Sequence, residues 1–106
     1  MTSRVDITTF VAKHAEGATV VDCREPFEYF SGHVPGAIAA PMSQFVQHLG
    51  SIPKDGDVYV ICATGNRSLA VADFLTRNGF RAHSVDGGTS AWVRAGHPIV
   101  TGHAAA

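Results

Sequence analysis

The chain has 106 residues, 45% of them hydrophobic, and a formal net charge of −1, so it is long enough for one domain with its own core. This charge balance excludes the basic patch of a nucleic-acid-binding protein, and no apolar run reaches the roughly 20 residues that a membrane-spanning helix needs. The N-terminus lacks a signal-peptide core, and the only two cysteines favour a reducing compartment over a disulfide framework. We therefore expect a cytoplasmic protein.

The first half of the chain alternates apolar stretches with turn and capping residues. This pattern first predicts a helix capped by Asp6 or Thr8 and ended by Gly17, and then a strand over residues 19–22. A helix from Glu25 to Gly32 and a short strand over residues 37–40 follow. The last two elements are a helix capped by Ser43 and a turn over residues 53–56.

The second half contains the longest continuous apolar run in the chain. Residues 58–61 are continuously apolar, which is typical of a strand buried on both faces of a parallel sheet. A helix is predicted over residues 68–78, followed by a strand over 82–85 and a helix over 89–95. Strands that alternate with helices predict an α/β fold, in which a parallel or mostly parallel sheet carries helices on both faces.

Cys62 lies where the central strand ends, just before a short loop and a helix. Ligands of parallel sheets bind beyond the carboxyl ends of the strands, and a helix N-terminus offers unpaired N–H groups and partial positive charge. Both effects, together with Arg67, would lower the pKa of the cysteine from its ordinary value of about 8.5. We interpret Cys62 as a nucleophile rather than as a small apolar core residue.

Three separate motifs resemble the rhodanese family, the sulfurtransferases that carry sulfur as a cysteine persulfide. Residues 62–68 read C-x-x-G-x-R-S, like the active-site loop of the family. Residues 22–37 resemble its D-x-R-x-x-x-E-[FY]-x-x-G-H-[IV]-x-G-A signature, and residues 85–92 resemble its G-G-x-x-x-W block. The resemblance implies a rhodanese-like three-layer domain over residues 1–101, with a mostly parallel five-stranded sheet and the Cys62 strand at its centre. Residues 102–106 are expected to form a frayed tail.

The resemblance also implies a chemistry for Cys62. Its thiolate would take sulfane sulfur from thiosulfate or a persulfide donor and pass it, as a Cys62 persulfide, to cyanide, a thiol or a protein thiol such as a thioredoxin-like or sulfur-carrier protein. The backbone N–H groups of the loop would bind the sulfur: Ala63, Thr64, Gly65, Asn66 and Arg67. We expect no cofactor, and the histidine spacing indicates no metal site. Partners would be small molecules or proteins, with no nucleic acid and no membrane.

Four residues of the second motif are interpreted as structural supports of this site. Asp22 and Arg24 follow a strand and could form a buried ion pair or hydrogen-bond network that holds the loops; Glu28 and His33 lie between that strand and the next. Sulfur transfer by a thiolate needs no proton abstraction at attack, so no general base is required. Arg67 has two interpretations of equal weight, contact with an anionic donor or a brace against a carboxylate.

Two other function classes remain as alternatives. Related phosphatases and arsenate reductases use a loop one residue longer; here four residues separate Cys62 from Arg67, which favours sulfur over a tetrahedral oxyanion. A non-catalytic docking module is disfavoured because the cysteine and its loop are intact, whereas a partner-dependent sulfur carrier stays open. A sulfur walled off from solvent, or amides turned away from it, would remove the enzyme assignment and leave only a scaffold.

Cys23 departs from the family pattern, in which an aliphatic residue is commoner at this position. One interpretation is a packed aliphatic substitute. The other is that Cys23 resolves a persulfide or sulfenate on Cys62 by forming a disulfide. Cα atoms more than about 7 Å apart, with diverging Cβ vectors, would exclude the disulfide.

Overall fold

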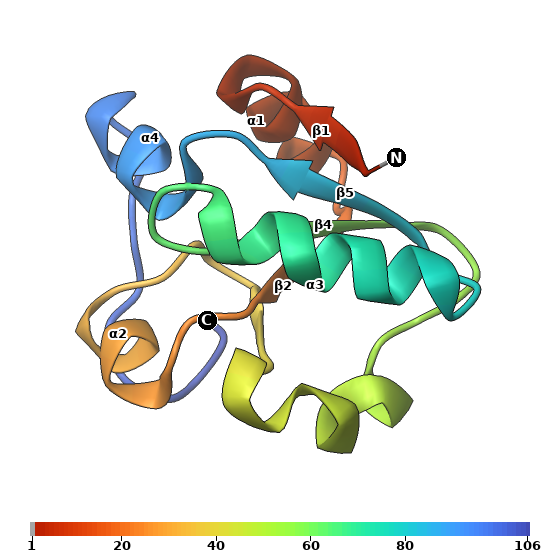
Figure 1. The fold of residues 1–106 in the computed structure, drawn as a ribbon. Helices are drawn as coiled ribbons and strands as arrows, with labels where there is room; N and C mark the ends of the chain where they lie inside the picture. Colours follow the sequence, from red (N-terminus) through yellow and green to blue (C-terminus); the bar gives the residue numbers. More distant parts are fainter. Residues whose placement is uncertain (1) are drawn as a thin grey trace.

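The computed structural model describes residues 2–106 and contains one five-stranded sheet, in which every strand pairing is parallel (Figure 1). The strand order is β1-β5-β4-β2-β3. The strands are β1 (Ser3–Val5), β2 (Thr19–Asp22), β3 (Ile38–Ala39), β4 (Asp57–Ile61) and β5 (Arg81–Val85). The fold class and the central position of β4, which leads into Cys62, are confirmed.

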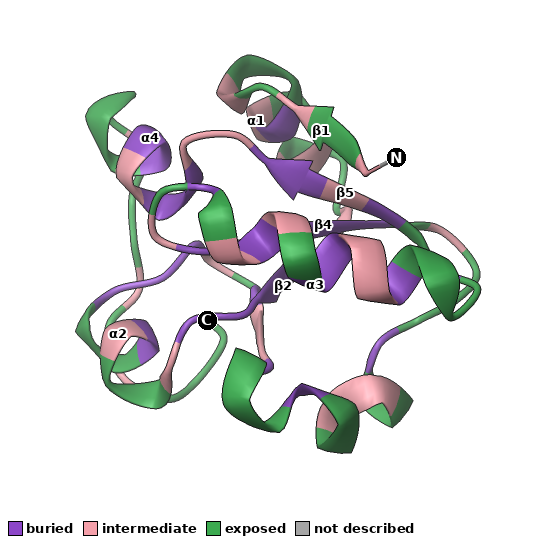
Figure 2. Cartoon of the chain, viewed as in Figure 1, coloured by how far each residue is buried: buried purple, intermediate pink, exposed green. Residues whose placement is uncertain are grey.

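The helices cover both faces of this sheet. They are α1 (Ile7–Ala15), α2 (Pro26–Ser31), the 3₁₀ helix η1 (Met42–Ser51), α3 (Asn66–Arg77) and α4 (Gly88–Arg94). Figure 2 shows buried positions concentrated in β2, β4 and β5 and on the inner sides of the helices. Side chains alternate along β4: Val58 and Val60 pack with α3 and η1, whereas Tyr59 and Ile61 pack with α1 and α4.

Local sequence signals explain several boundaries. Asp6 caps α1, because its Oδ1 accepts a hydrogen bond of 2.8 Å from the Thr9 N–H. Pro26 opens α2 in its first turn, as expected. The prediction that Ser43 caps a helix is wrong: η1 begins after Pro41, and the Ser43 hydroxyl donates to Glu25 Oε1 over 2.7 Å.

The C-terminal tail differs from the expectation of a frayed segment. The Gly36 N–H donates to the Ala105 carbonyl oxygen and the Gly102 N–H to the Phe30 carbonyl oxygen, each over 2.8 Å. The ring nitrogen Nε2 of His33 lies 2.8 Å from the Ala104 carbonyl oxygen. The tail therefore packs back on the segment that follows α2.

Candidate active site

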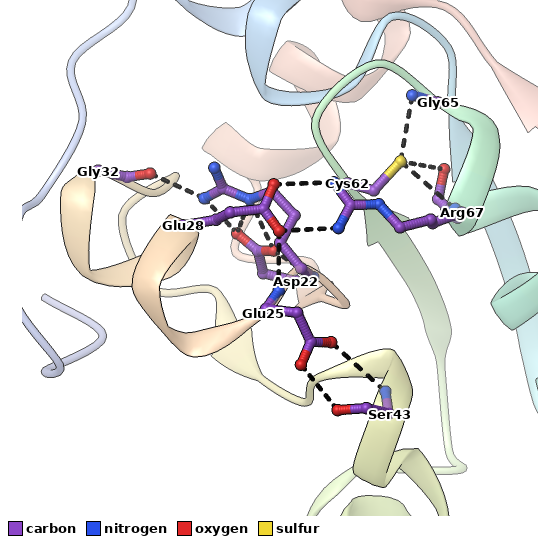
Figure 3. Close-up of polar contacts among 10 residues, drawn as sticks. Asp22, Glu25, Glu28, Gly32, Ser43, Cys62, Gly65 and Arg67 are labelled. Atoms are coloured by element: carbon purple, nitrogen blue, oxygen red, sulfur yellow. Dashed lines mark hydrogen bonds and ion pairs between the residues drawn. The ribbon is translucent and has the colours of Figure 1, made fainter.

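The Cys62 sulfur lies inside a short loop that joins β4 to α3. Gly65, at the N-cap of α3, has a φ of 105°, a backbone conformation that favours glycine. This turn brings the Gly65 N–H to 3.1 Å from Sγ, and the Ser68 N–H lies 3.4 Å from the same atom (Figure 3). The Gly65 amide belongs to the N-cap of α3 and the Ser68 amide to its first turn, where backbone N–H groups have no partner within the helix.

Ser68 adds a side-chain contact that the loop prediction, which ended at Arg67, missed. Its Oγ lies 3.4 Å from Cys62 Sγ and 2.8 Å from the Oγ of Ser84 on β5. When the sulfur is ionised, the Ser68 hydroxyl donates to it and the Ser84 hydroxyl can donate in turn to Ser68. The signal was present as the last residue of the C-x-x-G-x-R-S motif.

These contacts favour the ionised form of the cysteine. A hydrogen bond from the Cys23 thiol, followed by those from Ser68 and the Gly65 N–H, lowers the pKa of Cys62 to about 4, although burial acts in the opposite direction. The same hydrogen bond, together with burial, raises the pKa of Cys23. Cys62 is therefore the thiolate of the pair and Cys23 the thiol.

The enzyme assignment requires that the amides of the loop point toward the Cys62 sulfur and that the sulfur is open to solvent; the structure meets the first condition and not the second. The amides of Gly65 and Ser68 point toward Sγ, as a thiolate site requires. Cys62 is only 1% exposed, so the prediction of a sulfur open to solvent is wrong, and this condition counts against an enzyme in the conformation described. A reactant can therefore reach Sγ only when the surrounding loop or side chains move.

Arg67 forms a two-point ion pair with Glu28 across the mouth of the loop. Its Nη1 and Nη2 donate to Oε1 and Oε2 of Glu28 over 2.7 and 2.8 Å (Figure 3). The hydrogen bond from Arg67 lowers the pKa of Glu28 to about 2. Of the two interpretations of Arg67, the geometry matches the brace against a carboxylate.

Asp22 and Arg24 form a second, buried pair at the end of β2. Arg24 Nε and Nη2 donate to the Asp22 carboxylate, the shortest contact being 2.8 Å, and Nη2 also donates to the Gly32 carbonyl oxygen over 2.7 Å. The pair thus ties the end of β2 to Gly32, the C-cap of α2. This is the geometry expected of a structural network.

His33 is fully buried and lies between backbone carbonyl groups. Nδ1 is 2.8 Å from the Tyr29 oxygen and Nε2 is 2.8 Å from the Ala104 oxygen. Its ring also stacks on Tyr29, with centroids 3.6 Å apart. Both ring nitrogens are engaged with the backbone, which fits a structural position.

A cavity of about 410 Å³ adjoins the Cys62 loop. It is lined by Arg24, Ala63, Thr89, Ser90, Val93 and Arg94. The Thr89 N–H donates to the Cys62 carbonyl oxygen over 2.8 Å, and the Ser90 N–H to the Ala63 carbonyl oxygen over 3.0 Å, so α4 is fixed directly to the loop. Arg94 forms no ion pair within residues 2–106, which makes this cavity suited to an anion.

Another hollow, of about 260 Å³, lies between η1 and α3. Its lining is apolar: Met42, Phe45, Val46, Ala70, Val71 and Phe74. No charged group faces it, so it does not suit an anionic reactant.

The part of the chain that the structure describes offers neither a metal site nor a membrane-spanning helix. Within residues 2–106, no three His, Cys, Asp or Glu side chains gather closely enough to hold a metal ion. None of the helices in that range has the length and apolar content to cross a membrane.

Comparison with known proteins places the chain in a family. Residues 8–95 match the model of the Rhodanese-like domain. A sulfurtransferase of Allochromatium vinosum is 38% identical over 86 residues, 80% of each chain. The thiosulfate sulfurtransferase GlpE of Pseudomonas entomophila is 34% identical over 90 residues, 84% of this chain and 83% of that protein.

Solved structures agree with this result. A rhodanese-related protein from Thermoplasma volcanium superposes with a TM-score of 0.85 at 33% identity, over 92% of this chain and 97% of that one. A rhodanese-like domain protein from Staphylococcus aureus gives a TM-score of 0.84 at 31% identity, over 97% and 100% of the two chains. The chain belongs to the rhodanese-like family.

Proposed function

We propose that this protein is a sulfurtransferase that moves sulfane sulfur through a persulfide on Cys62. The observation that carries the proposal is the set of donors around Sγ: the Gly65 N–H, the Ser68 N–H and the Ser68 hydroxyl. Donors fixed by the fold stabilise negative charge on sulfur without reorganisation. The sulfurtransferases among its relatives support the same class of reaction.

The reaction has two steps. The Cys62 thiolate attacks the outer sulfur of thiosulfate, the S–S bond of thiosulfate breaks, and sulfite leaves with the bonding electron pair. Cys62 then carries the sulfur as a persulfide anion. A thiolate or cyanide attacks the outer sulfur, and the Cys62 thiolate is released as the leaving group. Thiosulfate is proposed as a donor because one relative is named a thiosulfate sulfurtransferase.

The experiment is intact mass spectrometry after incubation with thiosulfate. We expect wild type to gain about 32 Da, the mass of one sulfur atom, with release of sulfite, whereas Cys62→Ser gains nothing. Addition of cyanide or a thiol should then remove the added mass. If the wild-type protein gains no mass and instead hydrolyses an aryl phosphate, phosphatase activity would replace sulfur transfer as the proposed function.

The same measurement separates the remaining alternatives. A docking module would gain no mass from any sulfur donor. A partner-dependent carrier would gain sulfur but would turn over slowly with thiosulfate and small thiols, and rapidly with its protein partner.

Arg94 is proposed to attract the anionic donor. It is the arginine that lines the cavity beside the loop without an ion pair in the described chain, whereas Arg67 is held by Glu28. We expect Arg94→Gln to raise KM for thiosulfate roughly fivefold, the equivalent of about 1 kcal/mol for an exposed charge contact, with a smaller effect on kcat. Arg77→Gln, which removes an arginine paired with Asp73 on α3, is the control. Equal KM values for wild type and Arg94→Gln would exclude this role.

A further inference from the structure

Cys23 and Cys62 occupy equivalent positions on neighbouring strands. Each is the first residue after its strand, and the parallel register runs up to the pair Asp22 and Ile61. The Cys23 N–H continues the ladder by donating to the Ile61 carbonyl oxygen over 3.0 Å. Adjacent strands lie about 4.8 Å apart, so this register, continued by one residue, gives a Cα separation inside the roughly 4.4 to 6.8 Å that a disulfide spans.

The two side chains also point to the same side of the sheet. Both belong to the apolar cluster that β4 forms with α3, together with Val21 and Val60. Cys23 is 0% exposed and Cys62 is 1% exposed, and both are free thiols. The neighbouring Cys23 thiol lowers the pKa of Cys62. The sulfur-transfer reaction proposed above makes no use of Cys23 as a reactant.

We propose that Cys23 is a resolving cysteine, which captures Cys62 as an internal disulfide after a peroxide has oxidised Cys62. In the first step the Cys62 thiolate attacks one peroxide oxygen, the O–O bond breaks and hydroxide leaves, so Cys62 becomes a sulfenic acid. In the second step the Cys23 sulfur attacks Cys62 Sγ, the S–O bond breaks, and the oxygen leaves as water with the proton from Cys23. Two thiols are oxidised and one peroxide is reduced to two waters.

The electrostatics set the order of the two steps. While Cys62 is a thiolate, its hydrogen bond and negative charge keep Cys23 protonated and unreactive, so the oxidant meets Cys62 first. Oxidation of Cys62 removes that charge and frees the Cys23 sulfur to act as nucleophile. Arg67, whose positive charge lowers the pKa of Cys23, then favours its ionisation, whereas Asp22 and burial oppose it.

The consequence is protection of the reactive sulfur. A sulfenic acid with no resolving thiol is oxidised further to a sulfinic acid, which thiols cannot reduce. A disulfide stops at the reversible stage, and two equivalents of a thiol reductant restore both cysteines. The disulfide form would hold Cys62 inactive until it is reduced.

The experiment treats the reduced protein with hydrogen peroxide and then blocks free thiols with iodoacetamide. We expect wild type to lose about 2 Da, to resist alkylation at both cysteines, and to yield a peptide pair that joins Cys23 to Cys62. Dithiothreitol should restore two alkylatable thiols. In Cys23→Ser and Cys23→Val, Cys62 should instead gain about 32 Da as a sulfinic acid that dithiothreitol does not remove. Circular dichroism checks that each variant is folded.

Other products would overturn the inference. One is wild-type protein that carries a sulfinic acid on Cys62 while Cys23 remains a free thiol. The other is a disulfide that joins the Cys62 residues of two chains. The peptide pair in wild type decides the question even if both Cys23 variants unfold. Because peroxide is the only reactant, the result is independent of sulfur transfer: disulfide formation without transfer activity would reject the proposed function and keep this inference.

Discussion

The Ser68 side chain contributes to the charge state of Cys62 from a position where it cannot itself react with a donor. We expect Ser68→Ala to raise the pKa of Cys62 above its value of about 4, by roughly one to two units, because a hydrogen bond to a charged group contributes about 1.5 to 3 kcal/mol. The rate of alkylation by iodoacetamide should fall roughly two- to tenfold at pH 5 and stay unchanged at pH 8, where both proteins are ionised.

The control for this prediction is Ser84→Ala, which removes the hydroxyl behind Ser68 and should shift the alkylation profile less. The pKa of Cys62 is lower in the folded chain than its ordinary value of about 8.5, so ionisation stabilises the fold fully above about that pH, and this contribution is lost as the pH falls toward about 4. Ser68→Ala should lose part of that contribution at neutral pH. An unchanged alkylation profile would remove Ser68 from the site.

Prediction from sequence was most informative for single residues that belong to a motif. The loop with Cys62 and Gly65, and the structural position of Glu28, follow from local sequence and resemblance. Ser84 could not be found in this way, because its contact with Ser68 joins residues 16 positions apart and depends on β5 lying beside β4. The partner of Arg67 stayed open for the same reason, since Glu28 lies 39 positions away.

The contact between α4 and the Cys62 loop depends on a residue without a side chain. Gly88, the first residue of α4, has a φ of 56°, and an added Cβ would lie 2.4 Å from the Cys62 carbonyl oxygen. We expect Gly88→Ala to lower the free energy of unfolding by about 3 kcal/mol, from backbone strain and displacement of α4, and to weaken the site. Urea unfolding and alkylation of Cys62 measure the two effects.

The matched control is Gly96→Ala. Gly96 also has a positive φ, of 86°, but nothing lies within 4 Å of an added Cβ. Only the conformational penalty of about 1 to 2 kcal/mol should remain. If both variants unfold at the same urea concentration, the close approach of α4 to the loop has no energetic importance.

Elements with a strong apolar pattern were predicted well. β2 and β4 are mostly buried and rich in β-branched or apolar residues, and β5 was expected from a weaker pattern; each was expected within one residue of its observed bounds. β1 was missed because its three residues are mostly exposed and polar, and it exists through pairing with β5. A helix capped by Ser43 was expected over this segment; η1 instead begins at Met42 as a 3₁₀ helix, and Gln44 has non-helical torsion angles within it.

At the scale of the whole molecule, the tail closes one side of the domain. We expect a chain that ends at Thr101 to lose about 2 kcal/mol of unfolding free energy, because the Gly36 N–H and the buried His33 ring lose their carbonyl partners. The pair of backbone hydrogen bonds between His33 and Val100 remains, so folding should persist. Urea unfolding measures the change, and an unchanged midpoint would restore the expectation of a frayed tail.

Strand order and tail packing are properties of the complete chain, and local patterns alone do not contain them. Alternating strands and helices predicted a parallel α/β sheet, but the central place of β4 came from the family resemblance. The tail of Gly, His and Ala residues carries no apolar pattern. Its position follows from backbone hydrogen bonds, which leave little trace in sequence.

The uniform direction of the strands has a practical consequence for attaching this protein to a surface. All five carboxyl ends face the Cys62 loop, so the opposite edge of the sheet is free of site residues. The two lysines of the chain, Lys13 and Lys54, come shortly before the starts of β2 and β4. Amine-reactive supports that bind these lysines would therefore hold the molecule by its inert end and leave its reactive end facing the solution.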